Sequence, residues 1–347
     1  MHYQFYNDYS ETAHAQCLAA LAHEPLTQAL GYGLDHVSEQ ASAAIRAACA
    51  APNAAVHFVS GGTQANLTVL SAIMKPFEAV IAAQTGHIFA NETGAIEATG
   101  HKVIPVTVNN GKLTPADISM VVAAHPWEHV VRPRVVFISQ STEIGTVYSL
   151  AELTALRDAC NQLNLYLYLD GARLGSALMS AGADWTLADI AALSDVFYIG
   201  GTKNGALLGE AVVIPNPTLQ ADFRFHLKQR GALLAKGRVV ASQFLALFRD
   251  GLFQELAAHA NLAANRLQAG LLELGATFDN LSRTNQVFPT LPNSVIAALQ
   301  KRYGFHSWKK IGETHQTIRL VTSWATSLDK VDDFLADAHA SIVTETV

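Results

Sequence analysis

Short apolar runs alternate with amphipathic stretches through the first two-thirds of the chain. The runs have the length of buried strands, and they occupy residues 54–60, 79–83, 103–108, 134–139, 165–170, 195–200 and 207–214. Stretches with helical spacing lie between them, among them residues 63–73 and 92–98. Apolar strands separated by helices indicate an α/β fold, with a mostly parallel central sheet covered by helices on both faces.

Local signals in several of these segments make this prediction more specific. Thr114 is followed by a proline, which is typical of a helix start. Ser149 and Glu152 have the spacing of a capping box and predict a helix to about residue 163. Pro105 lies inside an extended run and favours an edge strand or a bulge there.

The pattern changes near residue 250. An Ala/Leu-rich helical periodicity runs from Phe244 to about Leu274. An extended segment at 285–289, a helix at 294–303, a strand at 317–323 and a last helix from Ser327 follow. We therefore expect a large domain over residues 1–250 and a smaller C-terminal α/β domain over residues 251–347. The N-terminal segment could reach the small domain or the active site.

Composition narrows the class of protein. Half of the 347 residues are hydrophobic and 15% are charged, which suits a large core and a buried subunit interface. A net charge of −6 and the lack of a basic tract argue against nucleic acid as a partner. No signal peptide and no apolar run of about 18 residues is visible, so a cytoplasmic protein without a membrane span is expected. Cys17, Cys49 and Cys160 are scattered and are expected to be reduced thiols.

Lys203 is the first candidate for chemistry. It ends a glycine-rich turn that directly follows the apolar run 195–200, and its neighbours are small and uncharged. A buried lysine whose pKa is lowered can form an imine with an aldehyde. The alternative is an ordinary surface lysine in a loop.

Asp170 follows a neighbouring strand of the predicted sheet. A carboxylate at this edge could accept a hydrogen bond from a protonated pyridine nitrogen, which would make the ring an electron sink. Lys203 and Asp170 together suggest an enzyme that uses pyridoxal 5′-phosphate (PLP). Arg173, three residues on, could bind a carboxylate as a two-pronged donor. The alternatives for Asp170 are a helix cap or an ion pair with Arg173.

Three further candidates lie where the same site would need them. Gly61, Gly62 and Thr63 stand between a strand and a helix, where main-chain N–H groups suit a phosphate; an ordinary capped turn is the alternative. His87 follows the run 79–83 and could stack on a flat ring or move protons, although a lone histidine is more often structural. Arg319 lies in a predicted strand of the small domain and could bind a substrate carboxylate.

A competing motif reads His125-Pro-Trp-Glu-His129, the order of an inverted zinc-protease signature. Such a site needs a helix and a third ligand. Pro126 and the segment Val130-Val-Arg-Pro-Arg134 interrupt a helix here, so a surface loop is expected and no metal site is predicted.

The motifs taken together resemble the fold-type-I PLP enzymes, and more narrowly the group of threonine aldolases and β-eliminating lyases. The matching segments span nearly the whole chain. They are residues 60–66, 86–97, 140–148, 169–174, 201–205 and 318–322.

The resemblance implies a role for each matching position. Lys203 would form the imine with the cofactor, Asp170 would pair with the pyridine nitrogen, and His87 would stack on the ring. Gly61, Gly62 and Thr63 would hold the phosphate. The positions implied for substrate binding are Arg173, Arg319 and Ser10. Lys228, Arg230 or Lys236 would reach a phosphate across a subunit interface.

The chain departs from the pattern of that group at two positions. Many threonine aldolases have a histidine where this sequence has Glu143, so Glu143 becomes a candidate base with a different charge and geometry. Gly61 stands where members of the group often have serine.

The function expected is PLP-dependent cleavage of β-hydroxy-α-amino acids, such as threonine or allo-threonine, to glycine and an aldehyde. Glu143, or His87 through a water molecule, would remove the β-hydroxyl proton. A β-eliminating lyase or an aminotransferase acting on a small amino acid is the alternative within PLP chemistry. A binding protein that kept the fold without activity is a further alternative. A homodimer or homotetramer with shared active sites is expected, because enzymes of this fold usually build each site from two subunits.

Overall fold

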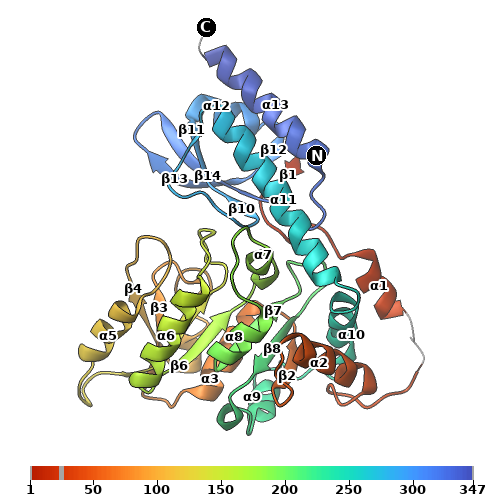
Figure 1. The fold of residues 1–347 in the computed structure, drawn as a ribbon, viewed down its shortest axis with the longest axis vertical. Helices are drawn as coiled ribbons and strands as arrows, with labels where there is room; N and C mark the ends of the chain where they lie inside the picture. Colours follow the sequence, from red (N-terminus) through yellow and green to blue (C-terminus); the bar gives the residue numbers. More distant parts are fainter. Residues whose placement is uncertain (1, 23–26, 346–347) are drawn as a thin grey trace.

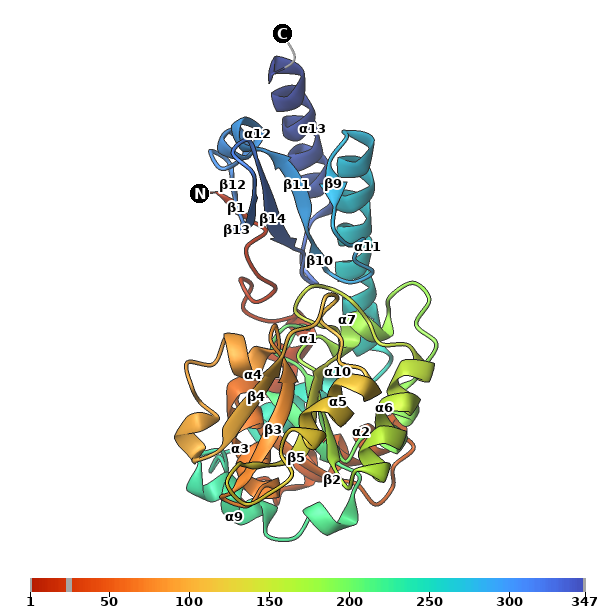
Figure 2. The ribbon, with the colours of Figure 1, turned by 90° about the vertical axis from the view of Figure 1, so that its left-hand side faces the viewer.

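The computed structural model describes residues 2–22 and 27–345. Figure 1 shows a large part built around a central sheet and a smaller part above it. The long helix α11 (Leu252–Glu273) leads from the large part to the smaller one. The helix α13 (Leu328–Glu345) closes the chain on the outside of the smaller part, as Figure 2 shows from the side.

The central sheet has seven strands in the order β2-β8-β7-β6-β5-β3-β4. From one edge to the other these are Ala55–Val59, Glu210–Ile214, Val196–Gly200, Tyr166–Asp170, Arg132–Ser139, Glu78–Ala83 and Lys102–Val106. Strand β8 runs antiparallel to both of its neighbours, and the other adjacent pairs are parallel. The predicted α/β fold with a mostly parallel sheet is confirmed.

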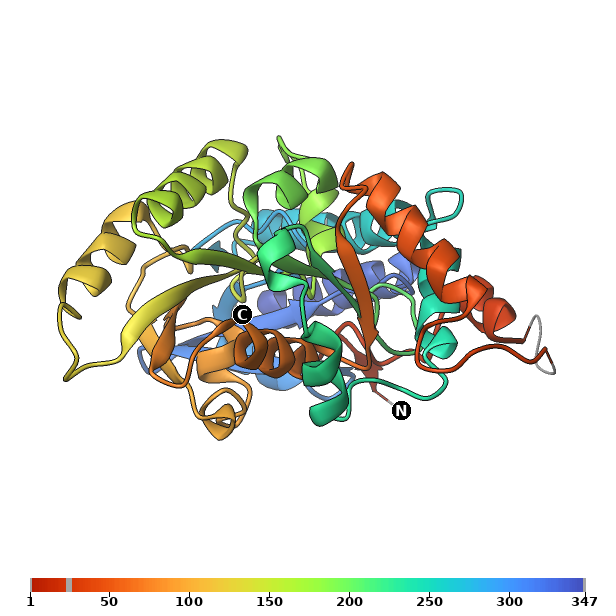
Figure 3. The same cartoon turned by 90° about the horizontal axis from the view of Figure 1, so that it is seen from below.

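Helices cover both faces of this sheet, as the view from below in Figure 3 shows. Because side chains alternate along a strand, Ile81 points into one apolar cluster and Val80 into the other. The first cluster takes in α2 (His36–Ala48), α5 (Pro115–Ala123), α6 (Leu150–Gln162), α8 (Leu187–Leu193) and α10 (Arg238–Leu247). The second takes in α3 (Gly62–Ile73) and α9 (Phe223–Gln229). Each fully buried Ile or Leu contributes roughly 1.5–3 kcal/mol by leaving water.

The predicted helix starts and the edge strand are confirmed. The hydroxyls of Thr114 and Ser149 accept hydrogen bonds from the main-chain N–H groups of Asp117 (3.3 Å) and Glu152 (3.2 Å). Both sites are full capping boxes. Pro105 lies in β4, which ends the strand order and therefore leaves one side of the proline free of ladder hydrogen bonds.

The helix predicted over residues 92–98 is wrong. The structure has a short helix α4 (His87–Ala90) before this segment and a single 3₁₀ turn η1 (Glu97–Thr99) at its end. Between them Thr93 and Gly94 adopt positive φ angles of 53° and 73°. Two successive left-handed residues cannot continue a right-handed helix.

The smaller part is built on an antiparallel sheet whose central strand is β14 (His315–Val321). Strands β10 (Gln286–Val287), β11 (Pro289–Pro292) and β13 (His306–Ile311) pair with it, and β9 (Thr277–Phe278) pairs with β11. The helix predicted over 294–303 is α12 (Asn293–Leu299), which ends before the strand β12 (Tyr303–Gly304). Near the N-terminus β1 (Tyr3–Gln4) pairs with β12, so the start of the chain joins this part. The domain division near residue 250 stays a prediction.

The remaining elements are short and connect the two parts or flank the sheet. They are α1 (Ala15–Ala22), α7 (Leu174–Leu178) and the 3₁₀ turn η2 (Pro217–Leu219). All three cysteines are free and buried. Among the described residues, no helix is both long and apolar enough to cross a bilayer.

Candidate active site

A pocket of about 320 Å³ lies at the carboxyl ends of the parallel strands. This is the edge at which open α/β sheets bind ligands, and the volume is within the range of small-molecule sites. Tyr9 of the N-terminal segment and residues from six strand ends line it. They are Tyr9, Ser60, Gly61, Gly62, Thr63, His87, Ser139, Ser141, Glu143, Asp170, Ala172, Arg173, Tyr198, Thr202, Lys203 and Glu210.

Lys203 lines this pocket after β7 and a tight turn. The turn needs its glycine, since a Cβ on Gly201 would lie 2.8 Å from the main-chain oxygen of Gly209. Burial lowers the pKa of Lys203, and the positive charge of Arg173 lowers it further. A lysine held in this way has a larger neutral fraction, which imine formation requires.

Asp170 lies at the end of β6 and is held by three donors. The hydroxyl of Tyr198 and the main-chain N–H of Ala172 donate to Oδ1, at 2.5 and 3.0 Å. The side-chain amide of Asn66 donates to Oδ2 at 3.2 Å. These contacts fix the carboxylate at the pocket wall. Neither of the simpler roles considered for Asp170, a helix cap or an ion pair with Arg173, is the contact that the structure shows.

The N-terminus of α3 opens into the same pocket. Its N-cap residue Gly61 provides no side-chain hydrogen bond, so the first N–H groups of the helix remain available to an anion. A Cβ on Gly62 would lie 3.0 Å from the hydroxyl of Tyr198, which explains why a small residue suits that position. A Cβ on Gly61 would meet no atom within 4 Å.

His87 and Glu143 meet on the opposite side of the pocket. The main-chain N–H of His87 donates to Oε1 of Glu143 at 2.9 Å, and the hydroxyl of Ser139 donates to the same oxygen at 2.6 Å. Burial raises the pKa of the Glu143 carboxyl, and the hydrogen bond from Ser139 only partly offsets this. A carboxyl with a raised pKa is better suited to accept and return a proton near neutral pH.

Arg173 forms an ion pair with Asp8 from the N-terminal segment. Its Nε and Nη2 lie 2.7 and 3.0 Å from the two oxygens of Asp8, a two-pronged geometry. The side-chain amide of Asn285 donates to Asp8 as well, at 2.8 Å. The buried Asp8 therefore holds one edge of the guanidinium and orients the rest of it toward the pocket.

Arg319 lies on β14 of the smaller part, outside the lining of the pocket. Burial lowers its pKa to about 10, and Arg173 adds to this effect because its positive charge is near. Its Nε is buried without a hydrogen-bond partner. An unpaired buried guanidinium N–H beside a pocket is a suitable donor for an anion.

The other predicted binding residues lie outside the pocket. Ser10 is exposed and its hydroxyl donates to the side chain of Asn7 at 3.1 Å, whereas its neighbour Tyr9 lines the pocket. Lys228 lies over the ring of Tyr32, at 4.7 Å from the ring centre. Arg230 ends α9, and Lys236 is exposed beyond it. Their predicted roles across a subunit interface stay predictions.

Several residues of the site were missed by sequence reasoning. They are Asp8, Tyr9, Asn66, Glu92, Tyr198 and Glu210. Glu210 is paired with Gly200 across β7 and β8, and it accepts a hydrogen bond from the N–H of Gly201 at 2.9 Å. Burial raises its pKa to about 7. A lone glutamate at the start of an apolar strand, Gly209-Glu-Ala-Val-Val213, was the available signal for it.

The His125–His129 segment lies after α5 in bends and turns rather than in a helix. Nδ1 of His125 contacts the main-chain oxygen of Val121 at 2.7 Å. Over residues 2–22 and 27–345, no group of three or more potential metal-binding side chains is found. The helical geometry that a zinc-protease motif requires is therefore not present at this segment.

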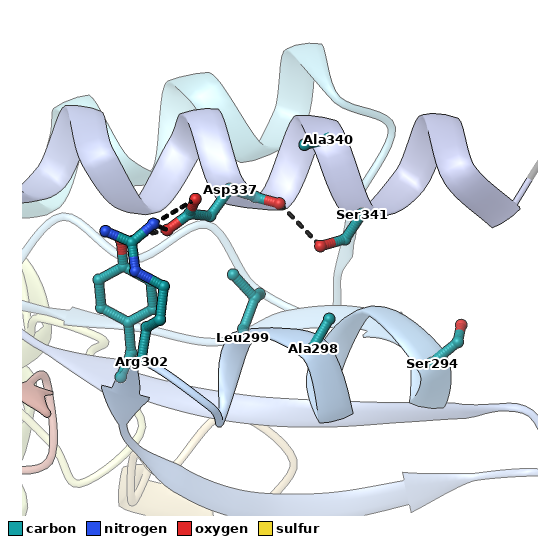
Figure 4. Close-up of a pocket in the computed structure, with 8 residues that line it drawn as sticks. Ser294, Ala298, Leu299, Arg302, Asp337, Ala340 and Ser341 are labelled. Carbon is teal, nitrogen blue, oxygen red and sulfur yellow. Dashed lines mark hydrogen bonds and ion pairs between the residues drawn. The ribbon is translucent and has the colours of Figure 1, made fainter.

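A second hollow of about 450 Å³ lies in the smaller part, between α12 and α13 (Figure 4). Its polar wall is an ion pair between Arg302 and Asp337, to which the hydroxyl of Tyr303 also donates, at 2.6 Å. The charges of Arg302 and Asp337 already compensate each other. We therefore place the chemistry at the pocket that contains Lys203.

The residues around Lys203 fit PLP in four respects. They offer an amine for its aldehyde, a carboxylate for its pyridine nitrogen, an open helix N-terminus for its phosphate and an imidazole beside the space for its ring. All four groups lie along one pocket at one sheet edge.

Comparison with known proteins agrees with this geometry. Residues 15–293 match the β-eliminating lyase family. The low specificity L-threonine aldolase of Pseudomonas aeruginosa is 35% identical over 285 residues, which are 81% of this chain and 82% of that protein. The solved structure of Leishmania major threonine aldolase superposes with a TM-score of 0.96 at 45% identity, covering 98% of this chain and 99% of that one.

A more distant likeness supports the fold alone. Thermus thermophilus aspartate aminotransferase superposes with a TM-score of 0.73 at 16% identity, over 98% of this chain and 91% of that one. The family match covers most of the chain, and the site has the groups that PLP chemistry requires. The chain belongs to the β-eliminating lyase family, a family of PLP-dependent enzymes.

Proposed function

We propose that this PLP-dependent lyase cleaves threonine or allo-threonine, and related β-hydroxy-α-amino acids, to glycine and an aldehyde. The observation that carries the proposal is the set of groups around one pocket: Lys203, Asp170, the open end of α3 and an arginine oriented by a buried aspartate. The similarity to two proteins described as threonine aldolases supports the same reaction.

Four groups of the chain would hold the cofactor. Lys203 would bind its aldehyde carbon, Asp170 its pyridine N–H, and the N–H groups of Gly62 and Thr63 its phosphate. His87 would lie against its ring. When bound, PLP supplies a ring that delocalises the electron pair left on Cα as the Cα–Cβ bond breaks.

Two charged side chains would orient the substrate carboxylate. The ion pair with Asp8 uses Nε and Nη2 of Arg173, so Nη1 is the part of the guanidinium that remains for a ligand. Arg319 would add the unpaired Nε–H from the smaller part. Arg173 and Lys203 line the same pocket, so a carboxylate held in this way would lie near Lys203.

The β-hydroxyl proton would pass to a base on the wall formed by Glu143 and His87. Glu143 has a raised pKa because it is buried, but its Oε1 already accepts hydrogen bonds from Ser139 and from His87. The imidazole of His87 is one-third exposed, with 34% of its side-chain surface accessible, so it can meet a substrate in the pocket. Both groups remain candidates at this step.

The test is to compare wild type with Lys203→Ala. Purified wild type should be yellow with bound PLP and should release acetaldehyde and glycine from threonine or allo-threonine. Lys203→Ala should lose the absorption of the lysine–PLP imine and should fall to background activity, because no other described lysine lines the pocket. Lys330→Ala is the matched control, since Lys330 is exposed and pairs with Asp333 on α13.

Other outcomes would point to other functions. Release of 2-oxobutyrate and ammonia instead of acetaldehyde and glycine would indicate β-elimination. Transfer of the amino group to a keto acid would indicate an aminotransferase. Bound PLP without turnover would indicate a binding protein, and a colourless protein that does not bind PLP would contradict the whole proposal.

We also propose that the protein is a cytoplasmic homodimer or homotetramer. An exposed apolar surface supports self-association: Leu30, Leu34 and Phe225 are 70, 61 and 75% exposed. Size measurement in solution tests the oligomeric state.

A further inference from the structure

Glu92 is a buried glutamate outside the pocket lining, and it contacts the ring of His87. The side chain of Glu92 is 0% exposed. Its Oε1 lies 2.8 Å from Nδ1 of His87 and 2.6 Å from the side-chain nitrogen of Asn66. Its Oε2 is buried without a hydrogen-bond partner. Burying a carboxylate costs free energy unless its charge is compensated by a partner. The contact between Glu92 and His87 therefore indicates a functional role for Glu92.

Asn66 connects Glu92 to Asp170. The side-chain nitrogen of Asn66 donates to Oε1 of Glu92 and to Oδ2 of Asp170, at 2.6 and 3.2 Å. Its side-chain oxygen accepts from the hydroxyl of Tyr168 at 2.8 Å. Because a carboxylate only accepts and an amide nitrogen only donates, these partners fix the orientation of the Asn66 amide. One hydrogen-bonded chain therefore runs from Asp170 through Asn66 and Glu92 to His87.

We propose that Glu92 is a positioning residue that keeps a proton on Nδ1 of His87, so that Nε2 presents its lone pair to the pocket as the base of the reaction. The proposal rests on the aldolase function proposed above. Asn66 holds the Glu92 oxygen in place and joins His87 to Asp170, the carboxylate that would pair with the pyridine nitrogen.

Hydrogen-bond chemistry gives the direction of the effect. An ionised Glu92 can contact Nδ1 only if that nitrogen carries the proton, which leaves Nε2 free to accept one. In the reaction the β-hydroxyl O–H bond breaks and its proton joins Nε2, while the Nδ1 proton stays where it is. The imidazolium that results lies against the negative charge of Glu92, which stabilises it.

Other charged groups surround His87 but contact it differently. Glu143, from the loop after β5, accepts from the main-chain N–H of His87 and not from its ring. Asp170, Arg173, Lys203 and Glu210 line the same pocket from the ends of β6, β7 and β8. In the described part of the chain, Glu92 is the carboxylate whose oxygen contacts a ring nitrogen of His87.

The first test compares Glu92→Gln with Glu97→Gln in the holoenzyme. The glutamine keeps the shape of the side chain but removes its charge, so kcat should fall by about ten- to a hundredfold, as for carboxylates that orient metal-binding histidines. The acid limb of the kcat/KM profile should move to lower pH, since the imidazolium loses the neighbouring negative charge. KM should change by less than about twofold. Glu97 is exposed on the same segment, and its replacement should change neither quantity.

A second test does not depend on activity. Nitrogen NMR of histidine-labelled holoenzyme, with the His87 signals identified by their loss in His87→Asn, should show the proton on Nδ1 and none on Nε2 at neutral pH. A proton on Nε2 would overturn the proposal, as would an unchanged pH profile in a folded Glu92→Gln enzyme. If wild type released no aldehyde, the proposed function would fail instead, and the NMR result would still decide the state of His87.

Discussion

The guanidinium of Arg173 depends on a carboxylate 165 positions away in the sequence. Asp8 is fully buried, and burial alone would raise its pKa. The positive charges of Arg173 and Lys203 outweigh burial and hold the pKa of Asp8 below its usual value. The charge on Asp8 therefore stabilises the folded protein, and it also fixes which edge of Arg173 is left for a substrate.

Asp8→Asn should lower the free energy of unfolding at pH 7 by about 3–5 kcal/mol, because it leaves a buried arginine without its counter-charge. Urea unfolding measures this. Asp332→Asn, which removes an exposed pair with Arg266, should cost only about 0.2–1 kcal/mol. The Asp8 contribution is present above its unfolded pKa of about 3.9 and is lost as pH falls through the lower folded value. The gap between wild type and Asp8→Asn should therefore narrow in acid, and equal losses in the two variants at pH 7 would contradict the assignment.

Residues that follow strands were the ones that the sequence could identify. Asp170 ends an apolar run, and Lys203 and His87 follow within four residues of one; parallel strands bring such ends to one edge. Asp8 and Glu92 do not follow an apolar run. Their roles depend on contacts with Arg173 and His87 that form only on folding. Tyr198 lies in an apolar run, so the sequence pattern predicts only that its side chain is part of the core. It does not predict that its hydroxyl donates to Asp170.

At the scale of elements, the N-terminus of α3 leads to a direct prediction about phosphate binding. Thr63 lies in its first turn and lines the pocket, where its hydroxyl can donate to a phosphate. Thr63→Val should weaken PLP binding by about ten- to a hundredfold, the effect of losing a hydrogen bond to a charged group. Equilibrium dialysis of PLP measures it. Thr154→Val is the control, because the exposed Thr154 hydroxyl donates to the carbonyl of Leu150 within its own helix. An equal change in both variants would show that Thr63 does not contact the phosphate.

Elements with local signals were predicted well, and elements that depend on partners were not. The caps of α5 and α6 are set by residues three positions apart, so they are visible in the sequence. Strand β13 has exposed charges at Lys309 and Lys310 and forms because β14 pairs with it, so its own pattern does not indicate a strand. Short strands such as β1 likewise depend on a distant partner, here β12.

At the scale of the whole molecule, residues 30–34 and helix α9 meet on one surface. The guanidinium of Arg224 donates to the main-chain oxygen of Tyr32 at 3.1 Å, and Lys228 lies over the Tyr32 ring. These contacts bring exposed Leu30 and Leu34 close to exposed Phe225 in the fold. Large side chains exposed together in this way mark a surface for association. The hydrophobic composition indicated only that such a surface could exist.

Phe225→Asp should therefore shift the protein from an oligomer toward a monomer, because a charge placed in an apolar interface must lose its water or keep the subunits apart. Sedimentation velocity over a range of protein concentrations measures the mass. Met120→Asp is the matched control. Met120 is 61% exposed on α5, which Figure 1 shows apart from α2 and α9, and its replacement should leave the mass unchanged. If Lys228, Arg230 or Lys236 completes a neighbouring phosphate site, the Phe225→Asp monomer should also bind PLP more weakly. An oligomer that withstands Phe225→Asp would place the interface on another surface.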